Sequence, residues 1–206
     1  MRHQLTLASI SLGALIPALV PAQHFTGNDK ITKLSAPVLL DTTGMFQAKI
    51  AKVGDDIFVG GQPTEKALRE MRAQGVTTVV NLRTPPEMTR SVKFDEPALV
   101  AQLGMKYVYL PVRGDTAYPY SPETVTKFNQ AVRESKGKVL LHCTVGWRAS
   151  HLWAAYLIEE RGVPLEEALA NAGAINLGGR DPRMPGRQPV ESFLNRDLPT
   201  LGRSPH

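Results

Sequence analysis

Cysteine is almost absent from this chain, which has one cysteine, Cys143, among 206 residues. A single thiol excludes an intramolecular disulfide, so Cys143 is either a small buried hydrophobic residue or a reactive group. A lone cysteine is more often the former, and its neighbours in the sequence have to decide between the two roles.

Metal-binding patterns are absent as well. The histidines outside the central motif show no pairing with Cys, Asp or Glu at the spacing of metal ligands, so we expect no metal; they are His3, His24, His151 and His206. The formal net charge is +5, but the basic residues are scattered and no basic-aromatic stretch is present. This argues against a nucleic-acid partner, whereas a mild basic excess suits an anionic ligand.

Only the N-terminus is strongly apolar. Arg2 and His3 precede a mainly apolar stretch, residues 5–20, that ends in Val20-Pro21-Ala22. A charged start, a short apolar core and small residues at the end are typical of a secretory signal peptide. We therefore expect a signal peptide at residues 1–22, with cleavage after Ala22 and export to the periplasm or medium of a bacterium. A buried helix or a retained anchor is the alternative.

The mature chain is expected to contain one domain. Residues 23–45 are mixed and rich in turn formers, which indicates an extended arm, and residues 46–206 are long enough for a single sizeable core. After removal of the leader, no second membrane segment and no internal repeat is found, so we expect no stable membrane insertion.

Strand and helix patterns alternate along this domain. Residues 48–63 predict two short strands around a Gly-Asp-Asp turn, and Pro85 with Pro86 predicts a loop. Further strands are predicted at 76–83, 105–112 and 138–143, and helices at about 64–75, 94–103, 121–137, 149–160, 164–173 and 191–197, with loops at 113–120 and 178–187. The alternation predicts an α/β fold with a central, mostly parallel sheet of about four to five strands and helices on both faces.

Cys143 stands at the carboxyl end of one of these strands, where ligands of such sheets bind. The following loop can turn its backbone N–H groups inward to make an anion site, and the next helix adds partial positive charge. Gly146 permits an unusual backbone shape, and the Arg148 guanidinium matches two oxygens of a phosphate or sulfate. The predicted anion-binding residues are Thr144, Val145, Gly146, Trp147 and Arg148.

A cysteine in such an electropositive loop is expected to ionise well below its free pKa of about 8.5. The resulting thiolate of Cys143 would be a nucleophile toward phosphorus or sulfur.

The motif HCTVGWRAS resembles the active-site loop of cysteine-dependent protein tyrosine and dual-specificity phosphatases. The stretch IFVGGQPTEKALREMRAQGVTTVVNLRT is similar to the first half of compact bacterial dual-specificity phosphatase-like proteins, a group that includes the beta-lactamase-hydrolase-like phosphatase domains. The resemblance runs from about residue 58 to residue 173. It implies hydrolysis of phosphate monoesters through a phosphocysteine intermediate, without a cofactor.

Two alignments of the loop with this family are possible. Counting five residues after Cys143 puts Ala149 in the place of the family's arginine and implies a weak or inactive binder of phosphate or phosphoproteins. Counting four residues keeps Arg148, as in the beta-lactamase-hydrolase-like group, and we favour this register. Rhodanese sulfurtransferases also use a six-residue cysteine loop, so a persulfide carrier on Cys143 is a further alternative.

The resemblance also assigns a general acid. Asp115 lies on the loop after the preceding strand, where the family has its acid, although a turn-forming Gly-Asp is the other interpretation. Glu123 is the reserve candidate, but its place in the first turn of a helix explains its charge.

Three residues are predicted to support the site. His142 should point away from Cys143 on its strand and order the loop rather than act as a base. Ser150 would either contact the thiolate or sit in the first helical turn. Arg83 would contact the anion or, as we favour, pin a loop. Trp147 is expected at the mouth and Trp153 in the core.

These residues together predict an exported, cysteine-dependent phosphatase. Its substrate would be a phosphorylated small molecule or an envelope protein.

Overall fold

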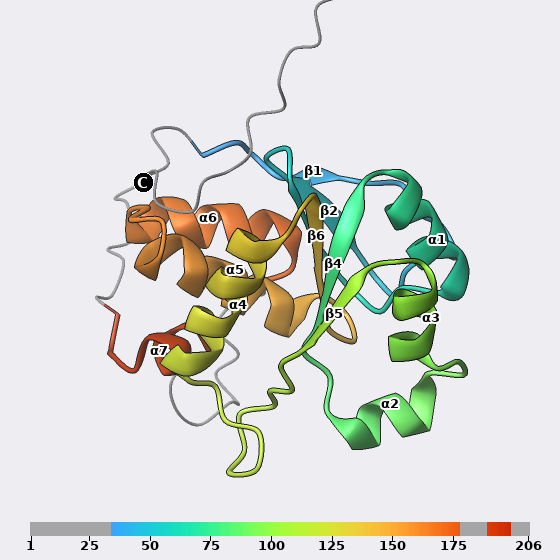
Figure 1. The fold of residues 1–206 in the computed structure, drawn as a ribbon. Helices are drawn as coiled ribbons and strands as arrows, with labels where there is room; N and C mark the ends of the chain where they lie inside the picture. Colours follow the sequence, from blue (N-terminus) through green and yellow to red (C-terminus); the bar gives the residue numbers. More distant parts are fainter. Residues whose placement is uncertain (1–33, 178–188, 199–206) are drawn as a thin grey trace, which may run out of the picture.

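The computed structural model describes residues 34–177 and 189–198 (Figure 1). The predicted leader, the start of the predicted arm and the predicted loop at 178–187 lie outside the described residues. The described chain forms one six-stranded sheet in the order β1-β2-β3-β6-β4-β5. Its strands are β1 (Val38–Leu39), β2 (Ile50–Val53), β3 (Ile57–Gly60), β4 (Val76–Asn81), β5 (Lys106–Tyr109) and β6 (Lys138–His142).

The predicted α/β fold is confirmed. Strands β3, β6, β4 and β5 run parallel to one another, and β2 and β1 add an antiparallel edge. The strand beyond those predicted, β1, falls in the described part of the predicted arm. Val38 and Leu39 are exposed, so no alternation of buried and exposed positions marks this strand in the sequence.

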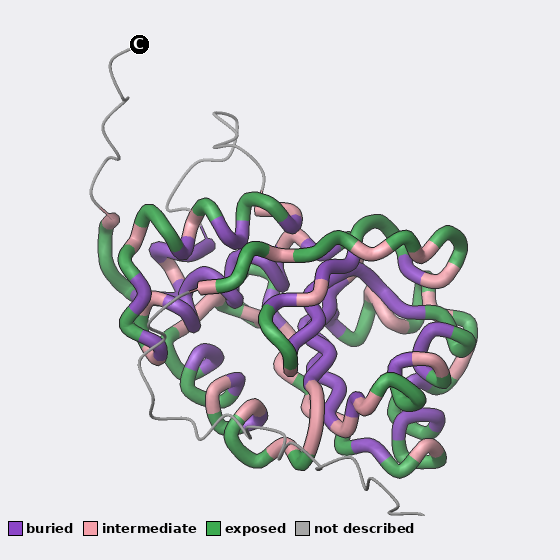
Figure 2. The backbone as a smooth tube through the Cα atoms, turned by 90° about the horizontal axis from the view of Figure 1, so that it is seen from above, coloured by how far each residue is buried: buried purple, intermediate pink, exposed green. Residues whose placement is uncertain are grey.

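Helices cover both faces of the sheet (Figure 1). One face carries α1 (Glu65–Ala73) and α3 (Glu96–Gln102), which share one apolar cluster with the sheet. The other face carries α4 (Pro122–Glu134), α5 (Trp147–Glu159), α6 (Leu165–Ile175) and α7 (Pro189–Leu194) around a second cluster. Buried backbone accordingly runs through the middle of the molecule and exposed backbone along its outer edges (Figure 2).

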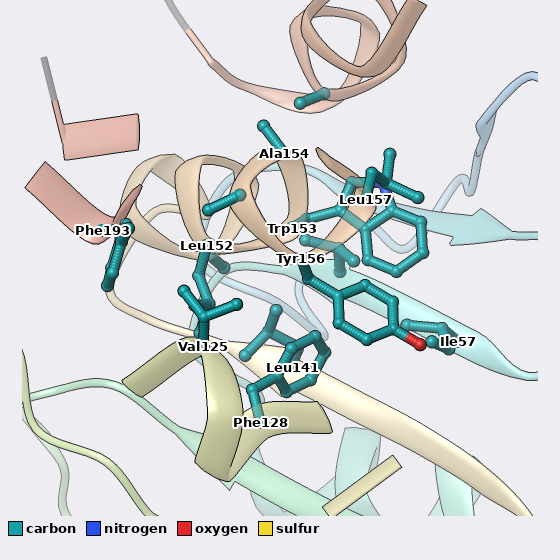
Figure 3. Close-up of a cluster of buried hydrophobic side chains, with 14 of the residues drawn as sticks. Ile57, Val125, Phe128, Leu141, Leu152, Trp153, Ala154, Tyr156, Leu157 and Phe193 are labelled. Atoms are coloured by element: carbon teal, nitrogen blue, oxygen red, sulfur yellow. The ribbon is translucent and has the colours of Figure 1, made fainter. Parts of the chain in front are cut away.

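Helix α5 is the centre of the larger cluster, since ten successive residues from Arg148 to Leu157 are buried. Trp153, predicted to lie in the core, is 4% exposed and stacks on Tyr156 (Figure 3). Tyr156 in turn meets the edge of Phe128 from α4 at a centroid distance of 5.1 Å. Because buried side chains surround α5 on most sides, packing fixes the position of this helix and of the end of the loop that leads into it.

The prediction of a loop at Pro85 and Pro86 is wrong, because helix α2 (Pro85–Ser91) begins there. Proline is favoured in the first turn of a helix, where its missing N–H would have no acceptor. Thr84 and Glu87 close a capping box in front of it, with the Thr84 N–H donating to Glu87 Oε2 at 2.9 Å.

No helix in the described ranges is long and apolar enough to cross a membrane.

Candidate active site

The cysteine loop starts directly at the end of β6, in the middle of the parallel part of the sheet. The Cys143 N–H donates to Gly60 O at 3.2 Å, and Thr144 O accepts from the Gln62 N–H at 3.0 Å. Val145 pairs with Gly61 in an isolated antiparallel bridge. The loop is therefore attached on one side to the end of β6 and on the other to the residues that follow β3.

Two glycines allow this attachment. A Cβ on Gly61 would lie 3.1 Å from Thr144 O of the loop and 1.6 Å from Gln47 O on the other side, so only glycine fits between the two. Gly146 has φ +83° and forms the N-cap of α5, as expected from its predicted unusual conformation.

The predicted boundary between loop and helix is wrong by two residues. Helix α5 begins at Trp147 rather than at residue 149, so Trp147 and Arg148 belong to its first turn. Within the described part of the chain, the backbone N–H groups of Thr144, Val145, Trp147 and Arg148 have no hydrogen-bond acceptor. Such a cluster of free N–H groups at a helix N-terminus is suited to binding an anion.

Arg148 points into the site. It is 8% exposed, and its Nη1 donates to Val112 O at 2.8 Å and to Leu82 O at 3.3 Å. Its Nη2 donates to Thr144 Oγ1 at 3.0 Å. Ala149 is completely buried in the apolar cluster, so the guanidinium that accompanies Cys143 is that of Arg148, as in the shorter register.

Glu87, which the sequence analysis missed, closes the site from the side of α2. Its carboxylate accepts from Arg148 Nη2 at 2.6 Å and from Nη1 at 2.9 Å. Burial by itself raises the pKa of Glu87, but the hydrogen bonds from Arg148 and Thr84 outweigh burial and lower it to about 2. The pKa of Arg148 is lowered by burial and raised more strongly by Glu87 and Cys143, so it lies above its ordinary value. Both groups are therefore ionised.

The sequence did contain a signal for Glu87. Thr84-Pro-Pro-Glu87 fits the capping-box pattern that opens a helix. That pattern predicts the capping contact, whereas only the folded structure, in which the Glu87 side chain reaches Arg148, reveals the ion pair.

Comparison with known proteins is consistent with this geometry. A model of the family described as "DSP-PTPase phosphatase fused to NAD+ Kinase" matches residues 37–183. The chain belongs to this family.

Two curated relatives of the phosphatase-like domain are named beta-lactamase hydrolase-like proteins. That of Xylella fastidiosa (strain Temecula1) is 27% identical over 133 residues, which are 63% of this chain and 30% of the relative. That of Agrobacterium fabrum is 27% identical over 106 residues, covering 51% of this chain and 24% of the relative. The match thus spans less than a third of each relative's length.

Solved structures show the same fold. The DUF442 phosphatase of Shewanella putrefaciens CN-32 is 26% identical, with a TM-score of 0.54 and coverage of 74% of this chain and 91% of that chain. P. aeruginosa TpbA is 20% identical, with a TM-score of 0.55 and coverage of 79% and 91%. The second likeness concerns the fold alone.

Cys143, at the expected nucleophile position of this phosphatase-like domain, is recessed. It is 1% exposed and packs within the apolar cluster on the α5 side, whereas Val145 at the outside of the loop is 38% exposed.

Asp115, the predicted general acid, lies in an exposed turn. Its Oδ1 accepts from the Ala117 N–H at 3.1 Å and from the Tyr118 N–H at 2.9 Å, which is the turn-forming role weighed above. Tyr120, which follows this turn, is partly buried, and its ring contacts that of Phe193. Burial raises the pKa of Tyr120 to about 12; Arg148 acts to lower this pKa, and Cys143 and Asp115 act to raise it. The segment that leads into this turn is held at the site, because Val112 O accepts from Arg148 Nη1 at 2.8 Å.

Arg83 is buried and makes three hydrogen bonds to other segments of the chain. It is 1% exposed, its Nη1 donates to Gln62 Oε1 at 2.7 Å, and its Nη2 donates to Glu87 O at 3.0 Å and to Ser91 Oγ. Burial lowers its pKa, which the neighbouring Glu87 partly offsets. Arg83 thus pins α2, the helix that presents Glu87 to Arg148.

The other supporting residues have partners other than the thiol, and none of the described residues makes a side-chain hydrogen bond to Cys143. His142 is fully buried, and its Nε2 lies 2.9 Å from Glu96 Oε1 on the α3 side. Ser150 donates to Gly146 O at 2.8 Å, which places its hydroxyl in the first turn of α5.

Trp147 is partly exposed beside the loop, and the centroid of its ring lies 4.3 Å from that of His151. Glu123, the reserve acid, pairs with Lys127 on the exposed side of α4.

In the ranges 34–177 and 189–198, no three His, Cys, Asp or Glu side chains gather closely enough to hold a metal ion. The site offers free N–H groups, an ionised guanidinium and a thiol, which together can bind an oxyanion and attack its central atom.

Proposed function

We propose that this protein is a cysteine-dependent phosphatase that hydrolyses phosphate monoesters. The observation that carries the proposal is the joint placement of Cys143, Arg148 and the free N–H groups of the loop at the carboxyl end of β6. Family membership supports it.

The proposed reaction has two steps. The Cys143 thiolate attacks phosphorus and the bond to the ester oxygen breaks, while Asp115 gives its proton to that leaving oxygen. Water then attacks the phosphocysteine and returns a proton to Asp115, and the phosphorus–sulfur bond breaks to release phosphate. The loop N–H groups and Arg148 hold the oxygens that stay on phosphorus, and they stabilise the charge that builds up on them.

The test uses the purified protein and a generic aryl phosphate. We expect hydrolysis by the wild type, and loss of at least about 10³-fold in Cys143→Ser and Arg148→Ala. Arg72→Ala is the matched control, because this exposed arginine on α1 donates to Leu103 O rather than to the cysteine loop. Equal activity in Cys143→Ser and the wild type would attribute the cleavage to another protein and refute the proposal.

The recessed thiol provides a second test. In the native protein we expect iodoacetamide to alkylate Cys143, and inorganic phosphate to slow this reaction. If Cys143 reacts only after denaturation, it is a core residue and the enzymatic proposal fails. The same preparation distinguishes the alternatives: a persulfide carrier would gain the mass of one sulfur from thiosulfate, and a pure binder would hold phosphate without turnover.

We further propose that the protein is exported and acts on phosphorylated small molecules or envelope proteins, which the signal-like residues 1–22 support. N-terminal sequencing of the protein from a periplasmic extract should begin at Gln23. A start at Met1 in the cytoplasm would refute export.

A further inference from the structure

A buried carboxylate that the proposed reaction does not use lies behind the cysteine loop. Glu96, at the start of α3, is 0% exposed, and its Oε1 accepts from His142 Nε2 at 2.9 Å and from Asn81 Nδ2 at 3.2 Å. Its Oε2 accepts from Gln62 Nε2. Burial raises the pKa of Glu96, but His142, Gln62 and Arg83 outweigh burial and lower it. The carboxylate is therefore ionised and fully engaged.

One of these contacts holds the residue just before the nucleophile. His142 is fully buried, and its other ring nitrogen, Nδ1, has no partner among the described residues, so Glu96 is the polar anchor of the ring. Side chains alternate along a strand, which directs His142 toward α3 and Cys143 toward α5. Glu96 thus orients the end of β6 without touching the thiol.

Another contact holds the residue just after the nucleophile. Gln62 donates to Glu96 through its side-chain amide, and its backbone N–H donates to Thr144 O at 3.0 Å. The same side chain accepts from Arg83 Nη1 at 2.7 Å, which connects the carboxylate to the arginine that pins α2.

We propose that Glu96 is a positioning residue of the cysteine loop. Its carboxylate holds His142 at the end of β6 and Gln62 after β3, and so it sets the distance between these two segments. The cysteine loop is attached to both segments, so its shape depends on that distance. The inference rests on the proposed function, because it assumes that the loop binds an oxyanion.

The test is Glu96→Gln in the full chain. The carboxylate of Glu96 accepts from three donors, and the side-chain amide of glutamine would turn its own N–H groups toward at least one of them. The hydrogen bond to His142 or to Gln62 would then be lost, and we expect the backbone N–H groups of the loop to shift. Two properties are measured: the affinity for tungstate by calorimetry, and the rate at which iodoacetamide alkylates Cys143. We expect tungstate to bind about 10- to 100-fold more weakly. Alkylation of Cys143 at a fixed pH should also be slower than in the wild type.

Thr78→Val is the matched control. Thr78 is a buried polar residue in the first half of β4, whereas Asn81 at the carboxyl end of this strand contacts Glu96. The Thr78 hydroxyl donates to Ser135 Oγ at 2.9 Å. We expect this variant to lower the melting temperature while tungstate affinity and the alkylation rate stay as in the wild type. Gln62→Leu serves as a second variant if Glu96→Gln does not fold, and it should act in the same direction.

The outcomes separate the two proposals. If Glu96→Gln or Gln62→Leu melts at a lower temperature but keeps wild-type tungstate affinity and alkylation, Glu96 supports only the fold and the inference is overturned. If tungstate affinity falls as expected while the wild type hydrolyses no phosphate ester, the positioning role stands and the proposed function fails. A wild type that binds no tungstate overturns both.

Discussion

Arg148 and Glu87 form a two-pronged ion pair, with Nη2–Oε1 and Nη1–Oε2 distances of 2.6 and 2.9 Å. The pair joins the first turn of α5 to the capping box of α2 and orients the guanidinium beside the cysteine loop. The protein thus holds both Nη atoms of the guanidinium, and Nε has no acceptor among the described residues.

Replacing Glu87 should loosen Arg148. Because hydrogen bonds to charged groups contribute about 1.5–3 kcal/mol, we expect Glu87→Gln to lower the free energy of unfolding by about 2 kcal/mol. We also expect kcat/KM for an aryl phosphate to fall by about 10- to 100-fold. Chemical denaturation and steady-state kinetics check this. Glu134→Gln, which removes an exposed pair with Lys106, is the control and should change neither quantity measurably.

The same pair predicts an acid dependence. The pKa of Glu87 is about 2 in the folded protein and about 4.5 when free, so its contribution to stability is complete above pH 4.5 and is lost as the pH falls toward 2. The difference in free energy of unfolding between wild type and Glu87→Gln should be constant from pH 5 to 8 and shrink below 4.5. A difference that grows on acidification would contradict the assignment.

His151 should produce a second, separate pH dependence. Burial lowers its pKa to about 4, against 6.5 when free, and its Nδ1 donates to Trp147 O at 2.7 Å. Between pH 4 and 6.5 the unfolded chain binds a proton there that the folded chain does not, so stability falls as the pH drops through this range. The slope should be at most about 1.4 kcal/mol per pH unit. His151→Gln should remove this slope, and an unchanged slope would show that other groups cause it.

Gly146 should be intolerant of a side chain. At φ +83° an alanine costs about 1–2 kcal/mol, and its Cβ would lie 3.3 Å from Gly60 C. Gly104 provides the control, since it has φ +68° but nothing within 4 Å of the place that a Cβ would take. Thermal denaturation should show a loss in both alanine variants. Only Gly146→Ala should also slow alkylation of Cys143, and equal alkylation rates in the two variants would argue against a tight fit of the loop on β3.

Asp115→Asn should separate the acid from the turn former. Asparagine can accept the same hydrogen bonds from residues 117 and 118, so the turn and the melting temperature should be kept. If Asp115 is the general acid, kcat should fall about 10²- to 10⁴-fold for an alkyl phosphate, whose leaving oxygen needs a proton. The effect on a phosphate with an acidic phenol leaving group should be much smaller. Unchanged kinetics with both substrates would remove Asp115 from the mechanism.

Much of the fold could be read from local patterns. The β-branched run of β4 and the Thr64 cap of α1 predicted their elements correctly. Each of these signals depends only on residues within a few positions of the element that it marks. The start of α2 at Pro85 and the two-residue strand β1 were missed. A proline pair is compatible with either a loop or a first helical turn, and Thr84 with Glu87 decides between them.

For the site, the spacing of Cys143, Gly146 and Arg148 after a strand was enough to indicate an anion-binding thiol, since those residues are neighbours in the chain and their chemistry does not depend on distant contacts. The partners of this loop depend on the packing of separate elements. Glu87 lies 61 positions from Arg148 in the sequence and Glu96 lies 46 positions from His142, and only the tertiary structure brings each carboxylate to its partner. A carboxylate in the first turn of a helix is common, so its presence in the sequence predicts no particular role. Its role depends on burial beside a specific donor, and only folding creates that contact.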